Sequence, residues 1–405
     1  MSIRKEFLLI RIRHVVSPVA LVGLLYLGGC AGTPVAPESG ATPPQQPAAS
    51  AVVTPPPAAP TPTAPQAQPP SASVAEPPAA ARAVQAPALD EAQRAKLAAL
   101  IEELVSRHAY DPNQLEALFQ GFAVDQSVIR LMTKPAEAMP WHRYRRIFIT
   151  PSRIAAGNAF WRKHERLLNQ VSQTYQVPPE LILAILGIET FYGKNVGTYP
   201  VLEANASLFL GYPRRSDFFR QQLVDFLLLS RQEGLDPWNT KGSYAGAMGM
   251  SQFISSSYRA YAVDGDGDGR RDLWGSIPDI TASVANYFKV HGWRLGQPVA
   301  IPAQLTPGAQ PQPFLSNDLR PRYTLEQLAG AGITPMVDTG GTLGAQLPVS
   351  LLKLDGTDGP EYFITFHNFY VITRYNRSPL YAMAAVEMMQ NLQQPGEEFD
   401  RSLSK

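Results

Sequence analysis

The feature that most constrains the fold is a helix-forming segment with apolar residues on almost all of its faces. It runs from Val177 to Gly193 and reads VPPELILAILGIETFYG. Pro178 and Pro179 suit the opening of a helix, because the first amides lack intrahelical acceptors and proline fixes a helical φ. Apolar residues then recur at the i, i+3, i+4, i+7 spacing and extend well beyond one face. The segment therefore predicts a helix in the middle of a domain.

A single carboxylate, that of Glu189, arrives in the last turn of this predicted helix. The negative end of the helix dipole, and an apolar wall expected from Phe191 and Tyr192, would both favour its protonated form. A proton held near neutral pH is what a general acid needs. From this segment alone, a surface glutamate at a frayed helix end is an equally good interpretation.

A second segment, KGSYAGAMGMSQF from Lys241 to Phe253, is rich in small residues. Small residues let a ligand or another backbone approach closely. Met250 and Phe253 supply apolar contact, while Ser243 and Gln252 can hydrogen-bond a neutral polar substrate such as a sugar. Tight packing of helices against these small residues explains them about as well.

These two segments and three later motifs resemble the membrane-bound lytic murein transglycosylase B family. The later motifs are YPRR at 212–215, SVANYFKVHGW at 283–293 and NFYVITRYNRS at 368–378. The resemblance covers the chain from about Leu89 to Leu392. It is far more specific than a short pattern, because the motifs are long and ordered.

The resemblance implies a lysozyme-like catalytic core that cleaves the MurNAc–GlcNAc bond of peptidoglycan without water and leaves a 1,6-anhydroMurNAc end. In that family the glutamate matching Glu189 protonates the glycosidic oxygen and later deprotonates the C6 hydroxyl group. The segments and the resemblance together predict eleven substrate-binding residues: Ser243, Gln252, Tyr144, Arg214, Arg215, Met250, Phe253, Tyr287, Tyr370, Tyr375 and Asn376.

Arg214 and Arg215 follow Tyr212-Pro213, where a break before a new helix would expose both side chains. Paired guanidinium groups suit carboxylates, which peptidoglycan carries on its stem peptides. On the sequence alone, an ordinary surface pair explains them equally well.

Ordinary glycoside hydrolysis uses two carboxylates. Glu203, Asp225, Glu233 and Asp236 are available, but a solvated or capping role on a helical segment suits each of them better. We therefore expect substrate-assisted chemistry, in which the N-acetyl group or the C6 hydroxyl group replaces the second carboxylate. A hydrolytic muramidase and a non-catalytic, calcium-stabilised wall-binding lipoprotein are the alternatives.

An acidic run, DGDGDGRRD at 264–272, matches the first half of an EF-hand loop. Aspartates occupy positions 1, 3 and 5, a glycine gives the turn at 6, and a backbone carbonyl follows at 7. Gly275 stands where position 12 normally carries glutamate, and the resemblance supplies Asp279 as the late ligand of a longer loop, 264–279. We expect a structural Ca²⁺ and no cofactor for catalysis; a solvated acidic turn is the alternative. The predicted ligands are Asp264, Asp266, Asp268, Arg270 and Asp279.

The first thirty residues read as a lipoprotein signal. Basic residues precede an apolar stretch, Val15–Leu27, that suits a signal peptide better than a membrane-spanning helix. Leu27-Gly28-Gly29-Cys30 resembles a lipoprotein box, and Cys30 is the only cysteine of the sequence. We expect removal of residues 1–29 and lipid anchoring at Cys30 on the periplasmic face of the outer membrane. A secreted protein with a stray cysteine is the alternative.

Composition divides the rest of the chain. Residues 30–88 are a tether, since 16 of the 38 prolines lie between 31 and 87 and the segment cannot bury a core. We expect a mainly α (α+β) fold: a helical domain at 89–178 that also uses part of 203–240, the lysozyme-like core at 179–296, a small antiparallel β domain at 297–362, a return to the core at 363–392, and a tail at 393–405. Predicted helices cover Asp90–His108, Asn158–Tyr175, Phe218–Gln232, Ile280–Val290, Thr324–Gly330 and Ser378–Leu392.

Charge and motifs exclude several other functions. The net charge of +1 leaves no basic footprint for nucleic acid. The sequence holds no H-E-x-x-H, C-x-x-C or P-loop pattern. The expected partners are peptidoglycan strands and, through the anchor, a membrane, with the protein a monomer; recruitment by cell-wall synthesis proteins is left open.

Overall fold

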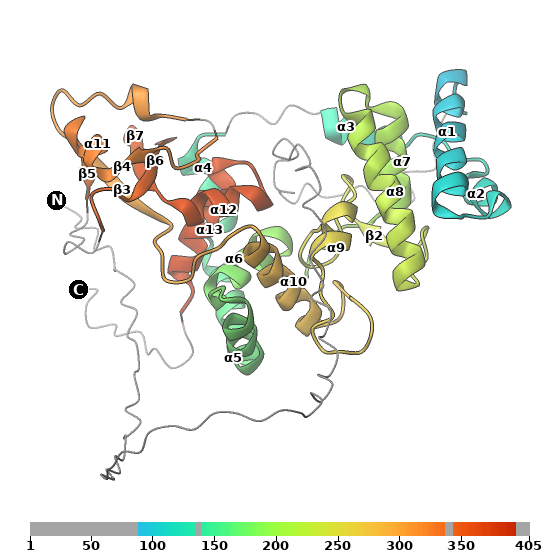
Figure 1. The fold of residues 1–405 in the computed structure, drawn as a ribbon, viewed down its shortest axis with the longest axis horizontal. Helices are drawn as coiled ribbons and strands as arrows, with labels where there is room; N and C mark the ends of the chain where they lie inside the picture. The colour runs from blue at the N-terminus through green and yellow to red at the C-terminus, as the bar shows by residue number, and fades with distance from the viewer. Residues whose placement is uncertain (1–87, 134–138, 317, 337–342, 394–405) are drawn as a thin grey trace, which may run out of the picture. The chain divides into compact units, whose positions relative to one another are not determined.

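The structure is a computed structural model that describes residues 88–133, 139–316, 318–336 and 343–393. Within these residues the protein is mainly helical, with two antiparallel sheets (Figure 1). The expected fold class, mainly α with a minor β part, is confirmed. The predicted signal peptide, Cys30, almost all of the tether and nearly all of the tail lie outside the described residues.

Seven of the thirteen described α-helices fall on segments that the sequence predicted, namely α1, α5, α6, α8, α10, α11 and α13; the other six were not predicted. Several begin at a side chain that accepts from a free backbone amide, as Asp90 does for α1 and Ser276 for α10. Their bounds are α1 Glu91–His108, α2 Pro112–Phe119, α3 Gln126–Thr133, α4 Trp141–Phe148, α5 Pro151–Tyr175, α6 Pro179–Thr190, α7 Val201–Gly211, α8 Ser216–Glu233, α9 Ser255–Tyr261, α10 Ile277–Val290, α11 Leu325–Gly330, α12 His367–Tyr375 and α13 Pro379–Asn391.

All six helices predicted by range are present, and three of them begin earlier than predicted. Helix α5 starts at Pro151 rather than at Asn158, because the Thr150 side chain accepts from the Arg153 amide and proline fits the first helical position. Helix α10 starts three residues early for the same reason, with Ser276 as its cap. Helix α8 begins at Ser216, two residues early.

Helix α6 is central, as its nearly continuous apolar surface predicts. Nine of its twelve residues are buried. It packs against α5, α10 and α13, which belong to distant parts of the sequence. The helix ends where Phe191 and Tyr192 both adopt positive φ angles, of 51° and 57°.

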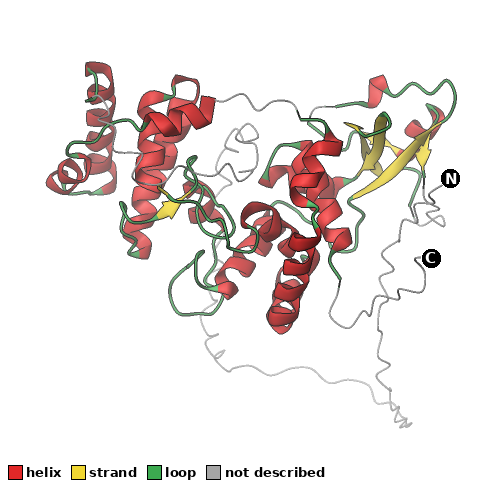
Figure 2. Cartoon of the chain, turned by 180° about the vertical axis from the view of Figure 1, so that it is seen from behind, coloured by secondary structure: helices red, strands yellow, loops and turns green. Residues whose placement is uncertain are grey.

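Two sheets complete the described structure (Figure 2). A two-stranded ladder joins β1 to β2, and a five-stranded antiparallel sheet has the order β4-β6-β7-β3-β5. The strands are β1 Tyr199–Pro200, β2 Lys241–Gly242, β3 Ala300–Leu305, β4 Tyr323–Thr324, β5 Ile333–Pro335, β6 Pro348–Asp355 and β7 Pro360–Thr365.

The larger sheet has its own small core, to which Leu328, Ile333, Leu351 and Ile364 belong. Strand β7 continues to Thr365, three residues past the predicted edge of the β domain, and leads almost directly into α12. The sheet is therefore joined to the helices that reach the candidate site. No helix of the described residues is long and apolar enough to cross a membrane.

Candidate active site

Glu189 is half-buried in the last turn of α6, as predicted, and a tyrosine from α13 binds it directly. The Tyr381 hydroxyl donates to Glu189 Oε1 at 2.6 Å, and Tyr381 is fully buried. The interpretation of Glu189 as a frayed surface residue is therefore wrong.

Burial raises the pKa of Glu189 to about 7, although the hydrogen bond from Tyr381 acts in the opposite direction. The carboxyl group consequently holds its proton near neutral pH and can also lose it there. A general acid that must later act as a base needs both properties.

Three tyrosines surround this carboxyl group. Burial raises the pKa of Tyr144, of Tyr375 and of Tyr381, and the negative charge of Glu189 raises each pKa further. They lie on or at the end of α4, α12 and α13, which come together in Figure 1. Tyr144 and Tyr375 were predicted site residues, and the structure brings both to Glu189.

The two aromatic residues after α6, from which we expected an apolar wall, have close neighbours of their own. Tyr192 packs so closely against Gly157 and Gly187 that a Cβ atom on either glycine would lie within 2.6 Å of its hydroxyl oxygen. The Phe191 ring lies under the cations of Arg153 and Lys194, at 5.0 and 4.4 Å from its centroid. These residues fix the turn that ends α6.

The small-residue segment, residues 241–253, folds back on itself beside α6, and we call it the curl. Gly242 pairs with Tyr199 of β1, and bridges join Met248 to Gly242 and to Phe253. A Cβ atom on Gly242 would lie 2.2 Å from the Ala247 carbonyl oxygen. This glycine therefore allows close approach of the protein's own backbone.

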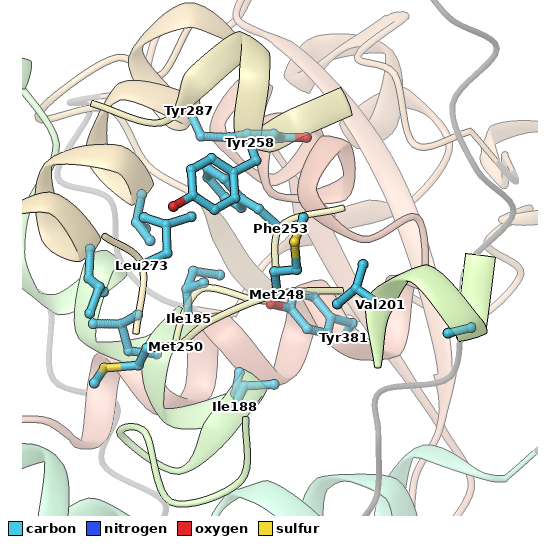
Figure 3. Close-up of a cluster of buried hydrophobic side chains, with 14 of the residues drawn as sticks. Ile185, Ile188, Val201, Met248, Met250, Phe253, Tyr258, Leu273, Tyr287 and Tyr381 are labelled. Atoms are coloured by element: carbon cyan, nitrogen blue, oxygen red, sulfur yellow. The ribbon is translucent and has the colours of Figure 1, made fainter. Parts of the chain in front are cut away.

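The apolar side chains of this curl pack under the site (Figure 3). Met248, Met250 and Phe253 belong to one buried cluster with Ile185 of α6 and Tyr381 of α13. Met250 and Phe253 are only 7% and 2% exposed, so both are mainly packing residues here.

One hydroxyl group ties the curl to the residue next to the acid. Thr190 Oγ1 donates to the Met250 carbonyl oxygen at 2.9 Å and accepts from the Gly193 amide at 3.1 Å. Since Thr190 follows Glu189 directly, movement of the curl would be transmitted to the end of α6.

The two predicted sugar-orienting residues of the curl partly serve the curl itself. Ser243 is buried, and its Oγ accepts from the Ala247 amide at 3.1 Å. Gln252 Nε2 donates to the carbonyl oxygens of Val196 and Gly249, at 3.2 and 2.9 Å. Their remaining polar atoms are the Ser243 hydroxyl proton and Gln252 Oε1.

An aromatic group continues from the curl to α10 and α12. The ring centroid of Tyr287 lies 4.8 Å from that of Tyr375 and 5.7 Å from that of Phe253. The Tyr287 hydroxyl donates to the Arg374 carbonyl oxygen at 2.5 Å. The predicted residues Phe253, Tyr287 and Tyr375 therefore form one contiguous aromatic cluster, in which Phe253 and Tyr287 are buried.

The other residues predicted from the last motif have different neighbours. The Tyr370 hydroxyl accepts from Arg320 Nη2 at 3.0 Å, so it meets the loop before β4. Asn376 Oδ1 accepts from the Ser378 amide at 3.0 Å, at the start of α13. These contacts place Tyr370 beside the loop before β4 and Asn376 at the junction of α12 and α13.

The two predicted arginines differ in exposure. Arg214 is exposed, as expected. Arg215 is not, because its guanidinium group lies over the rings of Phe218 and Phe219, at 4.0 and 5.2 Å. Burial lowers the pKa of Arg215, and the charge of Arg377 lowers it further. The expectation that both arginines are exposed is therefore wrong for Arg215.

The other candidate carboxylates have partners of their own. Asp225 pairs with Arg259, and Glu233 accepts from Arg271 Nε at 2.9 Å. Asp236 caps a turn and accepts from the Trp238 amide at 2.9 Å. No carboxylate of the described residues contributes to the pKa shift of Glu189.

The predicted calcium loop brings three carboxylates together. One oxygen each from Asp264, Asp266 and Asp268 lies within 4.8 Å of the others. Asp264 also accepts from the Gly269 amide at 2.8 Å, and backbone hydrogen bonds lower its pKa. Hard anionic oxygens at this spacing are the donor set that calcium prefers.

The remaining two residues predicted for the loop form hydrogen bonds within it. Asp279 is 1% exposed, and its two oxygens accept from the amides of Gly265 and Asp272, at 2.7 and 2.6 Å. Arg270 is exposed, and its amide donates to Asp268 Oδ1 at 2.8 Å. In the described geometry Asp279 braces the loop from the first turn of α10.

The loop also touches the curl at the site. The Met250 amide donates to the Leu273 carbonyl oxygen at 2.7 Å. A Cβ atom on Gly249 would lie 2.3 Å from the same carbonyl oxygen. The loop is therefore hydrogen-bonded to, and closely packed against, the backbone of the curl.

Sequence reasoning missed Tyr381 and Thr190. Tyr381 lies in the apolar α13 sequence PLYAMAAVEMM, where a tyrosine is ordinarily read as core. Thr190 carries no signal beyond its place next to Glu189. Only the packing of α13 against α6 reveals their roles.

A mainly α fold with one half-buried, protonatable carboxyl group in an aromatic site defines a lysozyme-like enzyme. Comparison with known proteins defines the family. The chain matches the Transglycosylase SLT domain family over residues 92–390. It is 42% identical over 311 residues to Membrane-bound lytic murein transglycosylase B of Escherichia coli (strain K12). The matched region covers 74% of this chain and 83% of that protein.

Solved structures agree with this match. Escherichia coli lytic transglycosylase Slt35 in complex with calcium is 43% identical, with a TM-score of 0.66 over 73% of this chain and 91% of that one. Pseudomonas aeruginosa SltB3 in complex with NAG-NAM-pentapeptide is 31% identical, with a TM-score of 0.66 over 74% and 79%. The chain belongs to the lytic murein transglycosylase family, as its motifs predicted, and is a lyase acting on peptidoglycan.

Proposed function

We propose that the enzyme cleaves the β-1,4 bond between MurNAc and GlcNAc without water and forms a 1,6-anhydroMurNAc end, with Glu189 as its single acid and base. The observation that carries this proposal is the half-buried Glu189 carboxyl group, with a pKa near 7 and no carboxylate among the groups that shift it.

In the first step, protonated Glu189 gives its proton to the glycosidic oxygen while the bond from that oxygen to C1 of MurNAc breaks. The GlcNAc side leaves with a hydroxyl group, and Glu189 becomes a carboxylate. The hydrogen bond from Tyr381 stabilises this charge, which lowers the barrier to proton donation.

In the second step, the MurNAc C6 hydroxyl group attacks C1 of the same sugar. Its proton passes to the Glu189 carboxylate, and a new C1–O6 bond closes the anhydro ring. The enzyme is thereby returned to its protonated form, and no water enters the balance. A second carboxylate nucleophile, as in retaining hydrolases, is not needed.

The surrounding residues would hold the sugar. The Gln252 amide oxygen and the Ser243 hydroxyl proton can bind the acetamido group, since their other atoms already bind the backbone. Half-buried Tyr375 offers a ring on which a sugar can pack, whereas Tyr144 and Tyr287 are buried and would shape the site around it. We assign supporting contacts with the substrate to Tyr370 and Asn376, whereas Met250 and Phe253, which are buried, would pack beneath the sugar site.

Arg214 and Arg215 would bind stem-peptide carboxylates. Charge complementarity favours this, and SltB3 is solved with a NAG-NAM-pentapeptide. Arg215, already held against two phenylalanine rings, would present a fixed guanidinium group, whereas exposed Arg214 would adapt.

We assign a structural Ca²⁺ to the 264–279 loop. The aspartates at 264, 266 and 268 supply the clustered oxygens, and the Arg270 carbonyl and Asp279 would complete the set. Slt35 is solved with calcium. The ion would take no part in bond cleavage, since Glu189 supplies and recovers the only proton that moves.

We also propose that Cys30 anchors the mature chain to the periplasmic face of the outer membrane, on the lipoprotein-box resemblance at residues 27–30. The E. coli relative is membrane-bound by name. Globomycin treatment should leave a larger precursor with residues 1–29 attached; an unchanged mass would contradict the anchor.

The test of the reaction is digestion of purified peptidoglycan by residues 31–405, wild type and Glu189→Gln, followed by mass spectrometry of the soluble products. We expect anhydro-muropeptides from the wild type alone. Products heavier by one water would instead identify a hydrolase. Release that does not depend on Glu189, or no release with calcium present, would contradict the assigned role of Glu189.

A further inference from the structure

A pocket of about 240 Å³ lies between α4 and the β6–β7 hairpin. Helix α4 contributes Trp141, His142, Arg145 and Arg146, and the hairpin contributes Thr357 and Glu361. None of the residues assigned to the acid site lines it. Tyr144, whose pKa the charge of Glu189 raises, lies on the same helix but does not line this pocket.

The walls of this pocket carry opposite charges that do not meet. Arg145 is paired with Glu387 of α13, at 2.8 Å, which leaves Arg146 as the available cation. Glu361, on the hairpin side, forms no ion pair with any described residue, and neither does Arg146. A ligand that carries both an anion and a cation could bridge the two walls.

A buried donor at the pocket also lacks a partner. Trp141 is 1% exposed, and its indole Nε1–H has no acceptor among the described residues. A buried donor without an acceptor is costly, by about 1–3 kcal/mol, and is rare. The neighbouring His142 is already held, with Nδ1 3.3 Å from the Asp355 carbonyl oxygen. The indole nitrogen offers no accessible surface to a ligand, so Trp141 borders the pocket with other atoms.

The volume limits what can enter. Pockets for drug-sized ligands usually have about 300–1,000 Å³, so this one suits one or two amino-acid residues better than a length of glycan.

We propose that this pocket is a second peptide site, which binds an amino-acid group bearing both a carboxylate and an ammonium ion. Arg146 binds the carboxylate, and Glu361 binds the ammonium group. The choice of ligand rests on the proposed function, because a peptidoglycan stem peptide with a diamino acid carries both charges. The site would hold a stem peptide one helix away from the acid.

The test uses residues 31–405 with Glu189→Gln and observes the indole N–H signals of the five tryptophans by ¹H–¹⁵N NMR. Trp141→Phe assigns the signal of interest by its loss. The probe is the free tetrapeptide L-Ala-γ-D-Glu-meso-diaminopimelyl-D-Ala. A matched probe has the side-chain amine acetylated, and a chitin tetrasaccharide serves as the glycan control.

We expect the tetrapeptide to shift the Trp141 indole signal, because Trp141 borders the pocket, and the shift to saturate. The other two probes should leave the signal in place. Arg146→Gln and Glu361→Gln should each weaken binding at least tenfold. Arg143→Gln is the matched control, since Arg143 is exposed on the same helix and does not line the pocket. No shift at millimolar tetrapeptide, or equal losses for Arg143→Gln and Arg146→Gln, would overturn the proposal.

This experiment distinguishes failure of the proposed peptide site from failure of the proposed reaction. Arg146→Gln in the otherwise wild-type enzyme should leave cleavage of peptide-free glycan unchanged and lower cleavage of peptide-bearing glycan. Tetrapeptide binding without anhydro products would refute the proposed reaction and keep the pocket. Anhydro products without tetrapeptide binding would support the proposed reaction and refute the peptide site.

Discussion

Replacing Glu189 by glutamine is expected to make the folded protein more stable at high pH. Burial raises the pKa of Glu189 from an ordinary 4.5 to about 7. Below pH 4.5 the group is protonated in both the folded and the unfolded chain, so it adds no pH dependence. Above that pH the unfolded chain loses the proton first, which favours unfolding until the folded group also ionises near pH 7.

The size of the effect follows from the two pKa values. At 1.36 kcal/mol for each pKa unit, ionisation of Glu189 lowers the free energy of unfolding by about 3 kcal/mol at pH 8. Because Glu189 is only half-buried, this is an upper estimate. Glutamine does not ionise and keeps an oxygen that can accept from Tyr381, so Glu189→Gln should escape this loss.

The assay is denaturant unfolding of residues 31–405 at pH 4, 6 and 8, with calcium held constant. The stability gain of Glu189→Gln should be near zero at pH 4 and rise toward pH 8. Glu116→Gln, an exposed position on α2, is the control and should show no such rise. A gain that is the same at all three pH values would refute the assignment of a raised pKa to Glu189.

Three further predictions concern the support of the site. Tyr381→Phe should lower kcat roughly tenfold or more, because a hydrogen bond to a charged group is worth about 1.5–3 kcal/mol. The alkaline limb of the pH–rate profile should move to higher pH, since that hydrogen bond lowers the pKa of Glu189; an unchanged limb would contradict the prediction. Chelation of calcium should lower Tm, by the equivalent of about 2.7 kcal/mol if calcium was at 100 times its Kd, and Asp264→Asn should abolish the response in a calorimetric scan. Gly197→Ala should unfold or strongly destabilise the protein, because its Cβ would lie 2.1 Å from a backbone oxygen. Gly234 also has a positive φ, 67° against 91° at Gly197, but lies in open space, so Gly234→Ala should cost about 1 kcal/mol by urea unfolding; equal losses would contradict the steric argument.

Local signals in the sequence predicted most of the helices because the forces that define them are local. Proline at Pro179, the capping residues Asp90 and Ser276, and the apolar spacing of α6 act within a few residues of each other. The errors in the predicted helix bounds also have local causes. Helix α5 begins earlier than predicted because its cap, Thr150, precedes the periodic segment.

Side-chain environments were harder to predict. The interruption between two helices at Pro213 correctly predicted that Arg214 is exposed. It did not predict the environment of Arg215, which packs against two phenylalanine rings of the next helix. Tyr381 reads as a core residue in sequence and is one in the structure, yet its hydroxyl group is the direct partner of the acid. Periodicity locates the buried face of a helix but does not identify which polar atoms on that face will form hydrogen bonds with distant residues.

The sequence by itself determined that a carboxylate ends a buried helix, that three aspartates share one loop, and that the chain resembles the lytic transglycosylases. These are properties of neighbouring residues or of ordered motifs. Only the tertiary structure decided the chemistry of Glu189, because the raised pKa requires burial among tyrosines from α4, α12 and α13. Desolvation depends on every group that surrounds a charge, and those groups meet only when distant segments pack together.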